Sequence, residues 1–390
     1  MGSSVYLDYN STTPIDPEVI DAMMPFWHEK WANPSSAHGF GNQVRRAVDR
    51  AREQVAALIG AEEPSEIIFT SGATESNNTV VQDTLSYSDK STTLITSPTE
   101  HAAIMGPAQQ LENKGGSVHW LAVDKNGSPD LNSFDDALNR ANNPLISLMW
   151  ANNETGVINP IPKLAERAVE KGALFHTDAV QMTGKLPFRI KDLPIQLLSL
   201  SGHKIYGPKG IGALYVRRGT RVAPHLVGGH QERARRAGTE NVPAIIGFGK
   251  ACELAASSMD ADATRINRLR DQLEHDILIS CKGAVLQAAD AERLPNTSNI
   301  SFDRLDGEAI LFMLDDQQIY VSTGSACESG SLEASHVLKA MGVESRHLNG
   351  SIRFSLGKQT TEDDVNRLIA VLPPIIDRCR ELAPHIDTDA

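Results

Sequence analysis

Lys204 directly follows a predicted buried strand at residues 197–200, within the run Ser201-Gly-His-Lys204. An ammonium group at the end of a buried strand is costly unless it is exposed, paired or covalently bound. A desolvated lysine near other cations has a lowered pKa and reacts as a nucleophile with carbonyl groups. Lys204 is therefore a candidate for covalent attachment to a carbonyl ligand.

Two other polar segments follow predicted strands. After the strand at residues 66–70, Gly72 allows a tight turn, and the N–H groups of Ala73 and Thr74 open a helix whose N-terminus suits a phosphate. Considered alone, this segment is equally well explained as an ordinary helix cap. Asp178 follows the strand at residues 174–177, where it could accept a charged N–H from a ligand or cap the next helix.

These features are informative in combination, because ligands of open α/β sheets bind beyond the carboxyl ends of the strands. A Schiff-base lysine, a carboxylate partner for the pyridinium nitrogen and a phosphate cradle are the contacts that pyridoxal 5'-phosphate requires. Lys204, Asp178 and the turn at Gly72 together predict this cofactor.

The elements that must position these residues have the pattern of an α/β fold. Seven short apolar segments, with helical segments between many of them, predict a mainly parallel sheet covered on both faces. They lie at residues 66–70, 94–96, 119–123, 145–150, 174–177, 197–200 and 211–216. A long helix at about 240–280 and short strands at 299–302, 319–321 and 351–354 predict a smaller α+β unit.

The length of 390 residues exceeds what one core usually supports. We predict a large cofactor-binding domain at residues 15–255 and a small domain formed by residues 1–14 and 256–390, which carries a cysteine loop.

Composition excludes several classes of function. The net charge of -12 argues against a nucleic-acid binder that relies on overall charge. No apolar run approaches the roughly 18 residues of a membrane span, and the N-terminus lacks signal-peptide features, so a cytoplasmic protein is expected. The cysteine spacing suggests no metal site. Cys252, Cys281 and Cys379 are predicted to be buried small hydrophobic residues.

The segment at 201–210, Ser-Gly-His-Lys-Ile-Tyr-Gly-Pro-Lys-Gly, resembles the cofactor-lysine motif of the class V aminotransferase superfamily. Further segments, spread over residues 5–380, narrow the resemblance to cysteine desulfurases of the NifS/IscS group, and residues 149–154 and 228–232 favour the NifS type. They include Tyr6-Leu-Asp-Tyr-Asn-Ser-Thr-Thr-Pro14, Thr99-Glu-His101, His176-Thr-Asp-Ala-Val-Gln181, Gly324-Ser-Ala-Cys327 and Ile352-Arg-Phe-Ser-Leu356. The resemblance implies the aspartate aminotransferase-like fold of the pyridoxal-phosphate-dependent transferases.

The resemblance also implies roles for individual residues. Lys204 would hold the cofactor and act as general base and acid, while His101 would stack on the ring. Arg353 would bind the substrate carboxylate as a bidentate fork, assisted by Asn153 and Asn33. The other implied cofactor contacts are Ala73, Thr74, Asn153, Asp178, Gln181, Ser201, His203 and, from the neighbouring subunit of a homodimer, Thr239.

Cys327 lies in Ser322-Thr-Gly-Ser-Ala-Cys-Glu-Ser-Gly330, whose small residues predict an exposed loop. The resemblance implies that the Cys327 thiolate takes the sulfur of L-cysteine, that L-alanine leaves, and that the persulfide passes to an acceptor such as an iron–sulfur scaffold protein. Glu328 stands where the group usually has threonine. Its carboxylate would raise the pKa of the Cys327 thiol if the two are close.

Two other functions remain open. The chain could be another member of the superfamily, such as a selenocysteine lyase or an aminotransferase, but those reactions need no persulfide carrier like Cys327. It could also be a non-enzymatic protein that keeps only the fold, against which the retention of Lys204, Asp178, His101 and Arg353 argues. Arg236 and its neighbours are predicted to form a solvated or interface surface.

Overall fold

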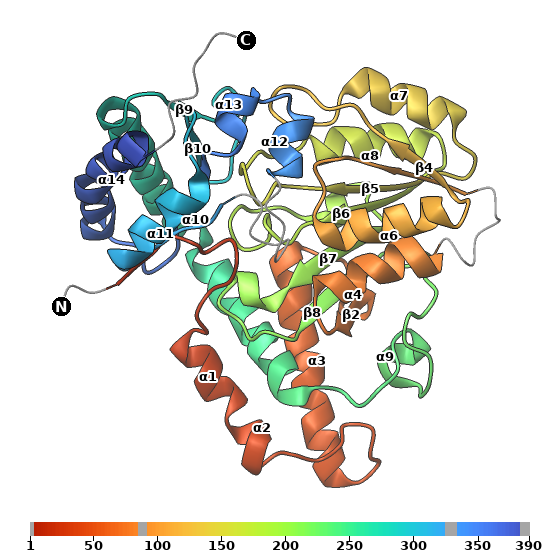
Figure 1. The fold of residues 1–390 in the computed structure, drawn as a ribbon. Coiled ribbons are helices and arrows are strands. Elements are labelled where there is room, and N and C mark those ends of the chain that lie inside the picture. Colours follow the sequence, from red (N-terminus) through yellow and green to blue (C-terminus); the bar gives the residue numbers. More distant parts are fainter. Residues whose placement is uncertain (1–3, 85–91, 324–333, 383–390) are drawn as a thin grey trace.

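The computed structural model describes residues 4–84, 92–323 and 334–382. Its largest element is a seven-stranded sheet with the strand order β2-β8-β7-β6-β5-β3-β4 (Figure 1). β8 is antiparallel to β2 and β7, and the other neighbours are parallel. The predicted mainly parallel seven-stranded sheet is confirmed. Its strands are β2 (Ile67–Thr70), β3 (Thr93–Thr96), β4 (Ser117–Trp120), β5 (Leu145–Met149), β6 (Leu174–Asp178), β7 (Leu197–Ser201) and β8 (Gly212–Val216).

Helices cover both faces of this sheet, which is why its strands are nearly continuously apolar (Figure 1). Successive residues of β2 alternate between the two faces: Ile67 and Phe69 belong to one core cluster and Ile68 to another. The first cluster also contains residues of α3 (Gly39–Ile59), α7 (Leu131–Arg140) and α8 (Ile161–Glu170). The second contains residues of α6 (Ala102–Asn113), and α4 (Ala73–Asn78) packs on the same region.

The edge strand β4 lies earlier in the chain than the predicted segment at 119–123. Its pairing with β3 starts at Thr93↔Ser117 and stops at Thr96↔Trp120, where β3 itself ends. Leu121 then donates its N–H to the Thr96 carbonyl (2.8 Å) and is 1% exposed. Of the apolar residues after Trp120, Leu121 is buried in the core, whereas Ala122 is exposed and Val123 forms an isolated β-bridge with Pro129.

The long helix α10 (Val242–Ser280) joins two cores. Ile245 and Phe248 pack with the large sheet, whereas Leu269 and Leu273 pack in a separate cluster. That cluster surrounds a second, antiparallel sheet with the order β12-β10-β9. Its elements are β9 (Ala284–Leu286), β10 (Thr297–Phe302), β12 (Ser351–Ser355), α11 (Gly307–Asp316) and α14 (Glu362–Leu382).

The N-terminal segment packs with this second core. β1 (Val5–Tyr6) pairs in parallel with β11 (Ile319–Tyr320), and Val5 and Leu7 are buried in the second cluster. A division of the chain into domains at residues 255/256 stays a prediction. The shorter helices are α1 (Pro17–Met23), α2 (Pro25–His28), α9 (Gln231–Ala234), α12 (His336–Ala340) and α13 (Ser345–Leu348). Within the described residues, no helix combines the length and the apolar character needed to cross a bilayer.

A buried histidine, His176, links three neighbouring strands of the large sheet. Its Nδ1 lies 2.9 Å from Oγ of Ser147 on β5, and its Nε2 lies 2.9 Å from Oγ of Ser199 on β7. Burial lowers the pKa of His176 to about 3. The neutral imidazole has one donor and one acceptor nitrogen, which the two hydroxyl groups satisfy.

This histidine makes stability depend on pH. An unfolded histidine titrates near about 6.5, so between that pH and about 3 the unfolded chain binds a proton at His176 that the native chain does not. The contribution of neutral His176 to the free energy of unfolding is fully present above about pH 6.5. Below that pH it falls by about 1.4 kcal/mol per pH unit. We expect His176→Gln to reduce the slope of the free energy of unfolding against pH by that amount. The free energy is measured by urea denaturation between pH 6 and 4. Exposed His275→Gln is the control; equal slopes in wild type and His176→Gln would contradict the assignment.

Candidate active site

A cavity of about 510 Å³ lies beyond the carboxyl ends of β5, β6 and β7. Most residues that the sequence singled out line it, although they come from elements far apart in the chain. The predicted site residues around the cavity are Ala73, Thr74, His101, Asn153, Asp178, Gln181, Ser201, His203, Lys204 and Arg353.

One end of the cavity offers donors for an anion. Ala73 and Thr74 begin α4, and Ser201 and His203 follow at the end of β7. Burial, and then the nearby Lys204 and Lys209, lower the pKa of His203 to about 4, so this ring is neutral near pH 7. Free N–H groups at a helix start, together with hydroxyl groups, suit a phosphate.

Glu75 on α4 also lines this end of the cavity, and an ion pair with Arg236 balances the negative charge of its carboxylate. Arg236 donates from Nε to Oε1 of Glu75 (2.9 Å) and from Nη2 to Oε2 (3.2 Å), while the Ser71 N–H donates to Oε2 (2.7 Å). Burial would raise the pKa of Glu75, but the hydrogen bonds from Arg236 and Ser71 outweigh it and the pKa lies below its ordinary value. Arg236 is thus paired with Glu75 while its side chain remains 22% exposed, and the prediction that it belongs to a solvated or interface surface stays a prediction.

Asp178 ends β6 and also lines the cavity, where two donors hold its carboxylate. Asn77 donates from Nδ2 to Oδ2 (2.7 Å), and the Val180 N–H donates to Oδ1 (3.0 Å). The carboxylate is 7% exposed. The sequence left two alternatives for Asp178, a cap for the next helix or a ligand contact. In the structure Asp178 caps the following turn and also lines the cavity.

His101 is the N-cap of α6, and the Ala103 N–H donates to its Nδ1 (3.1 Å). Burial lowers the pKa of His101, nearby Asp178 raises it less, and Lys204 and His336 lower it further. The neutral ring therefore carries its proton on Nε2, because Nδ1 is occupied as an acceptor.

Lys204 lies directly after β7, and its amine reaches the N-terminal segment. Its Nζ donates to the carbonyl oxygens of Asn10 (2.5 Å) and Ser11 (2.7 Å). A second half-buried lysine, Lys185, donates from Nζ to Gln181 and to Oδ1 of Asn10 (3.2 Å). Burial, followed by the charges of Lys204 and Arg353, holds the pKa of Lys185 well below its ordinary value.

The sequence analysis assigned no role to Asn10, Ser11 or Lys185. The first two lie within a segment that the resemblance included, but a motif does not show which of its residues point into a cavity.

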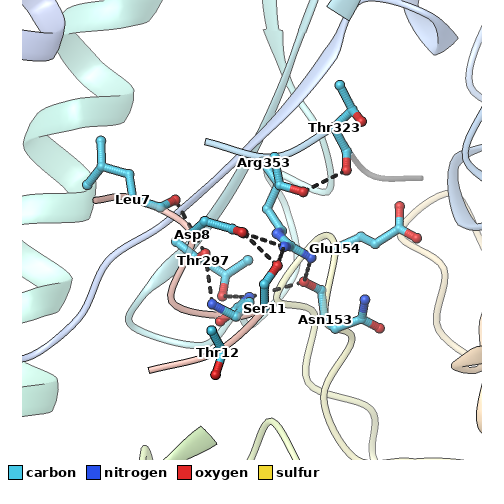
Figure 2. Close-up of polar contacts among 12 residues, drawn as sticks. Leu7, Asp8, Ser11, Thr12, Asn153, Glu154, Thr297, Thr323 and Arg353 are labelled. Carbon is cyan, nitrogen blue, oxygen red and sulfur yellow. Dashed lines mark hydrogen bonds and ion pairs between the residues drawn. The ribbon is translucent and has the colours of Figure 1, made fainter. Parts of the chain in front are cut away.

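Arg353 on β12 closes the cavity from the side of the second sheet. Its side chain is 2% exposed and pairs with Asp8, with Nη2 2.6 Å from Oδ1. Nη2 also donates to Oγ of Ser11 (2.7 Å), and Nη1 donates to the Asn153 carbonyl oxygen (3.2 Å). Figure 2 shows the guanidinium group held between these three residues.

The remaining predicted site residues lie elsewhere. Asn33 is exposed and its Oδ1 accepts the Ser35 N–H (2.8 Å), so the structure does not bring it to the cavity. Thr239 lines a separate pocket of about 180 Å³ with Arg236. Cys327 and Glu328 lie outside the described residues. Cys252, Cys281 and Cys379 are buried, as predicted.

The profile of one protein family, described as aminotransferase class-V, matches residues 5–368. The chain belongs to the class-V aminotransferase family. It is 49% identical over 388 residues to a cysteine desulfurase of Trichormus azollae, covering 100% of this chain and 96% of that protein. It is 48% identical over 383 residues to the cysteine desulfurase NifS of Azotobacter vinelandii, covering 98% and 95%.

Solved structures agree with this family membership. A NifS-like protein superposes with a TM-score of 0.90 at 37% identity, over 96% of this chain and 100% of that chain. SspA in complex with cysteine superposes with a TM-score of 0.79 at 34% identity, over 91% and 99%. The predicted pyridoxal-phosphate-dependent transferase fold is confirmed.

Pyridoxal 5'-phosphate is the cofactor of this family, and the cavity fits it. An amine, a carboxylate and a group of anion donors line one space, at Lys204, Asp178 and the start of α4. Gly72 precedes α4 with φ 153°, and a Cβ atom there would meet no atom within 4 Å, so the backbone can approach a ligand closely.

Proposed function

We propose that the protein is a cysteine desulfurase, a sulfurtransferase that releases L-alanine from L-cysteine and carries the sulfur as a persulfide on Cys327. The observation that carries this proposal is that Lys204, Asp178, His101 and Arg353 line one cavity, in a chain 48% identical over 383 residues to a NifS cysteine desulfurase.

The cavity residues divide into those that would hold the cofactor and those that would act on the substrate. Lys204 would bind the cofactor covalently and Asp178 would pair with its ring nitrogen, with Gln181 and Asn153 at the ring hydroxyl. Ala73, Thr74, Ser201 and His203 would hold the phosphate. When bound, pyridoxal 5'-phosphate supplies an electron sink for bonds broken at the substrate α-carbon.

Arg353, Lys204 and Cys327 would act on the substrate, and the neutral ring of His101 would pack on the cofactor. Arg353 would bind the α-carboxylate, and Lys204 would remove the α-proton and later return a proton. Cys327 acts as a thiolate: its Sγ forms an S–S bond with the substrate sulfur while the C–S bond breaks. The electron pair of that bond stays with the carbon fragment, which is protonated and leaves as L-alanine.

The proposal includes two protein partners. Thr239 lies in its own pocket rather than in the cavity of its own chain, which supports its predicted contribution to the cofactor of a second subunit in a homodimer. The persulfide then passes to an acceptor protein of iron–sulfur cluster assembly or a related sulfur-delivery step in the cytoplasm.

The holoenzyme, given L-cysteine and dithiothreitol, is expected to release sulfide and L-alanine in equal amounts. Sulfide is measured colorimetrically and alanine by amino-acid analysis. L-Selenocysteine and an L-alanine/2-oxo acid pair serve as parallel substrates. Turnover of selenocysteine without cysteine turnover would identify a selenocysteine lyase instead, and amino transfer to the oxo acid would identify an aminotransferase.

A further inference from the structure

Arg353, which is proposed to bind the substrate carboxylate, already donates hydrogen bonds to other groups of the protein. Asp8 and Ser11 both accept from Nη2, at 2.6 and 2.7 Å, and the Asn153 carbonyl oxygen accepts from Nη1. Ser11 also donates from Oγ to Oδ1 of Asp8 (2.8 Å), so its hydroxyl group bridges the two ions. Figure 2 shows Asp8 and Ser11 converging on the guanidinium group.

The geometry of the guanidinium group limits how a second carboxylate can bind. A guanidinium group binds a carboxylate through two hydrogen bonds, from Nε and Nη2 or from Nη1 and Nη2. Nη2 therefore takes part in both bidentate arrangements. Asp8 and Ser11 both accept from Nη2, so a ligand that uses this nitrogen must compete with them. Nε is buried and, within the described residues, has no hydrogen-bond partner. A ligand can therefore use two donors only after one resident group has released Nη2, and the same movement must open a path to the buried Nε.

Ser11 is the resident group that can leave. Ser11 and Arg353 line the cavity, whereas Asp8 does not, so an incoming ligand meets the hydroxyl group first. Asp8 pairs with Arg353 as an ion (2.6 Å), whereas Ser11 contributes only a neutral hydroxyl group, so the Asp8 contact is the stronger of the two. The Ser11 hydroxyl can keep its bond to Asp8 when it gives up Arg353.

We propose that the Ser11 hydroxyl group is a place-holder on Arg353 that the α-carboxylate of the substrate displaces, while Asp8 retains the arginine. This inference rests on the proposed role of Arg353 in the desulfurase reaction. A carboxylate replaces the lost hydroxyl contact with two charge-assisted hydrogen bonds from Arg353, which a neutral ligand cannot form. The exchange therefore makes Ser11 a residue that sets the affinity of Arg353 for carboxylate ligands.

The test uses propionate, which carries the carboxylate but neither the amine nor the sulfur of cysteine. Its dissociation constant is obtained from the concentration dependence of the holoenzyme melting temperature, which needs no turnover. Ser11→Ala removes the place-holder and is expected to tighten propionate binding about two- to tenfold, the range that one hydrogen bond supplies. Ser11→Thr keeps a hydroxyl group and should bind propionate as the wild type does. Propionamide is the neutral ligand control.

Unchanged or weaker propionate binding by Ser11→Ala would overturn the proposal, because the hydroxyl group would then support Arg353 instead of occupying it. Equal binding of propionamide and propionate by the wild type would also overturn it, because displacement of the hydroxyl group would then need no carboxylate. This outcome differs from failure of the desulfurase assignment. That failure would appear as missing sulfide release from L-cysteine while propionate still bound.

Discussion

Cys327→Ala is expected to lower the rate of sulfide release from L-cysteine by at least about a thousandfold, because no other group is proposed to receive the sulfur. The remaining cavity residues would still bind L-cysteine, so the loss should appear in kcat while the dissociation constant of the substrate changes little. Sulfide release with dithiothreitol is measured under saturating L-cysteine. The matched control is Cys379→Ala, a cysteine that is buried in the second core and 6% exposed.

Mass spectrometry separates this prediction from an indirect effect on folding. After brief exposure to L-cysteine without reductant, the Cys327 peptide of the wild type should gain one sulfur atom, about 32 Da, and the Cys379 peptide should not. Full activity of Cys327→Ala, or a persulfide on another cysteine, would show that Cys327 is not the sulfur carrier. The same experiment distinguishes a desulfurase from an aminotransferase and from a non-enzymatic protein.

Lys204→Ala is expected to remove both the covalent attachment of the cofactor and the proton carrier, and so to lower turnover at least about a thousandfold. Borohydride reduction of the wild-type holoenzyme should fix the cofactor on the Lys204 peptide, as read by mass spectrometry. The variant should show no lysine adduct and should release its cofactor on gel filtration. Lys125→Ala, which changes an exposed lysine paired with Asp290, is the control that keeps the adduct.

The structure makes this a sharp test, because it contains a rival amine. Lys185 is half-buried, its pKa is well below the ordinary value, and it lies close enough to Lys204 for the two charges to interact. Such a lysine is also a competent nucleophile toward carbonyl groups. A reduced adduct on Lys185 in the wild type would contradict the assignment to Lys204. An adduct on Lys185 in Lys204→Ala alone would show that the second amine can substitute.

The parts of the site that follow strand ends could be predicted from the sequence. Lys204, Asp178 and the turn before Ala73 each come directly after an apolar segment, and parallel strands place such positions at one edge of the sheet. Thr239 and Asn33 were assigned by resemblance only. The structure places Thr239 in a separate pocket and Asn33 on an exposed turn.

Contacts between distant segments could not be predicted in this way. Arg236 and Glu75 are separated by 161 positions, and a run of arginines reads as a solvated surface until its partner is known. The segment at 119–123 was placed too late for the same reason. The pairing ends at Trp120 because β3 ends at Thr96, and the sequence of residues 119–123 contains no information on the length of that partner strand.

By itself, the sequence determined the α/β architecture and the positions of Lys204, the proposed cofactor lysine, and of Asp178, because hydrophobic periodicity and strand ends are local properties. Only the tertiary structure decided what surrounds Arg353. Asp8 and Arg353 are 345 positions apart and meet because β1 pairs with β11 and the Asp8 backbone bridges to Ser355. Lys204 likewise finds its carbonyl partners, Asn10 and Ser11, in that N-terminal segment. Local patterns contain no information on such pairings. Only the folded chain therefore shows that Asp8 and Ser11 bind Arg353, the proposed binding residue for the substrate carboxylate.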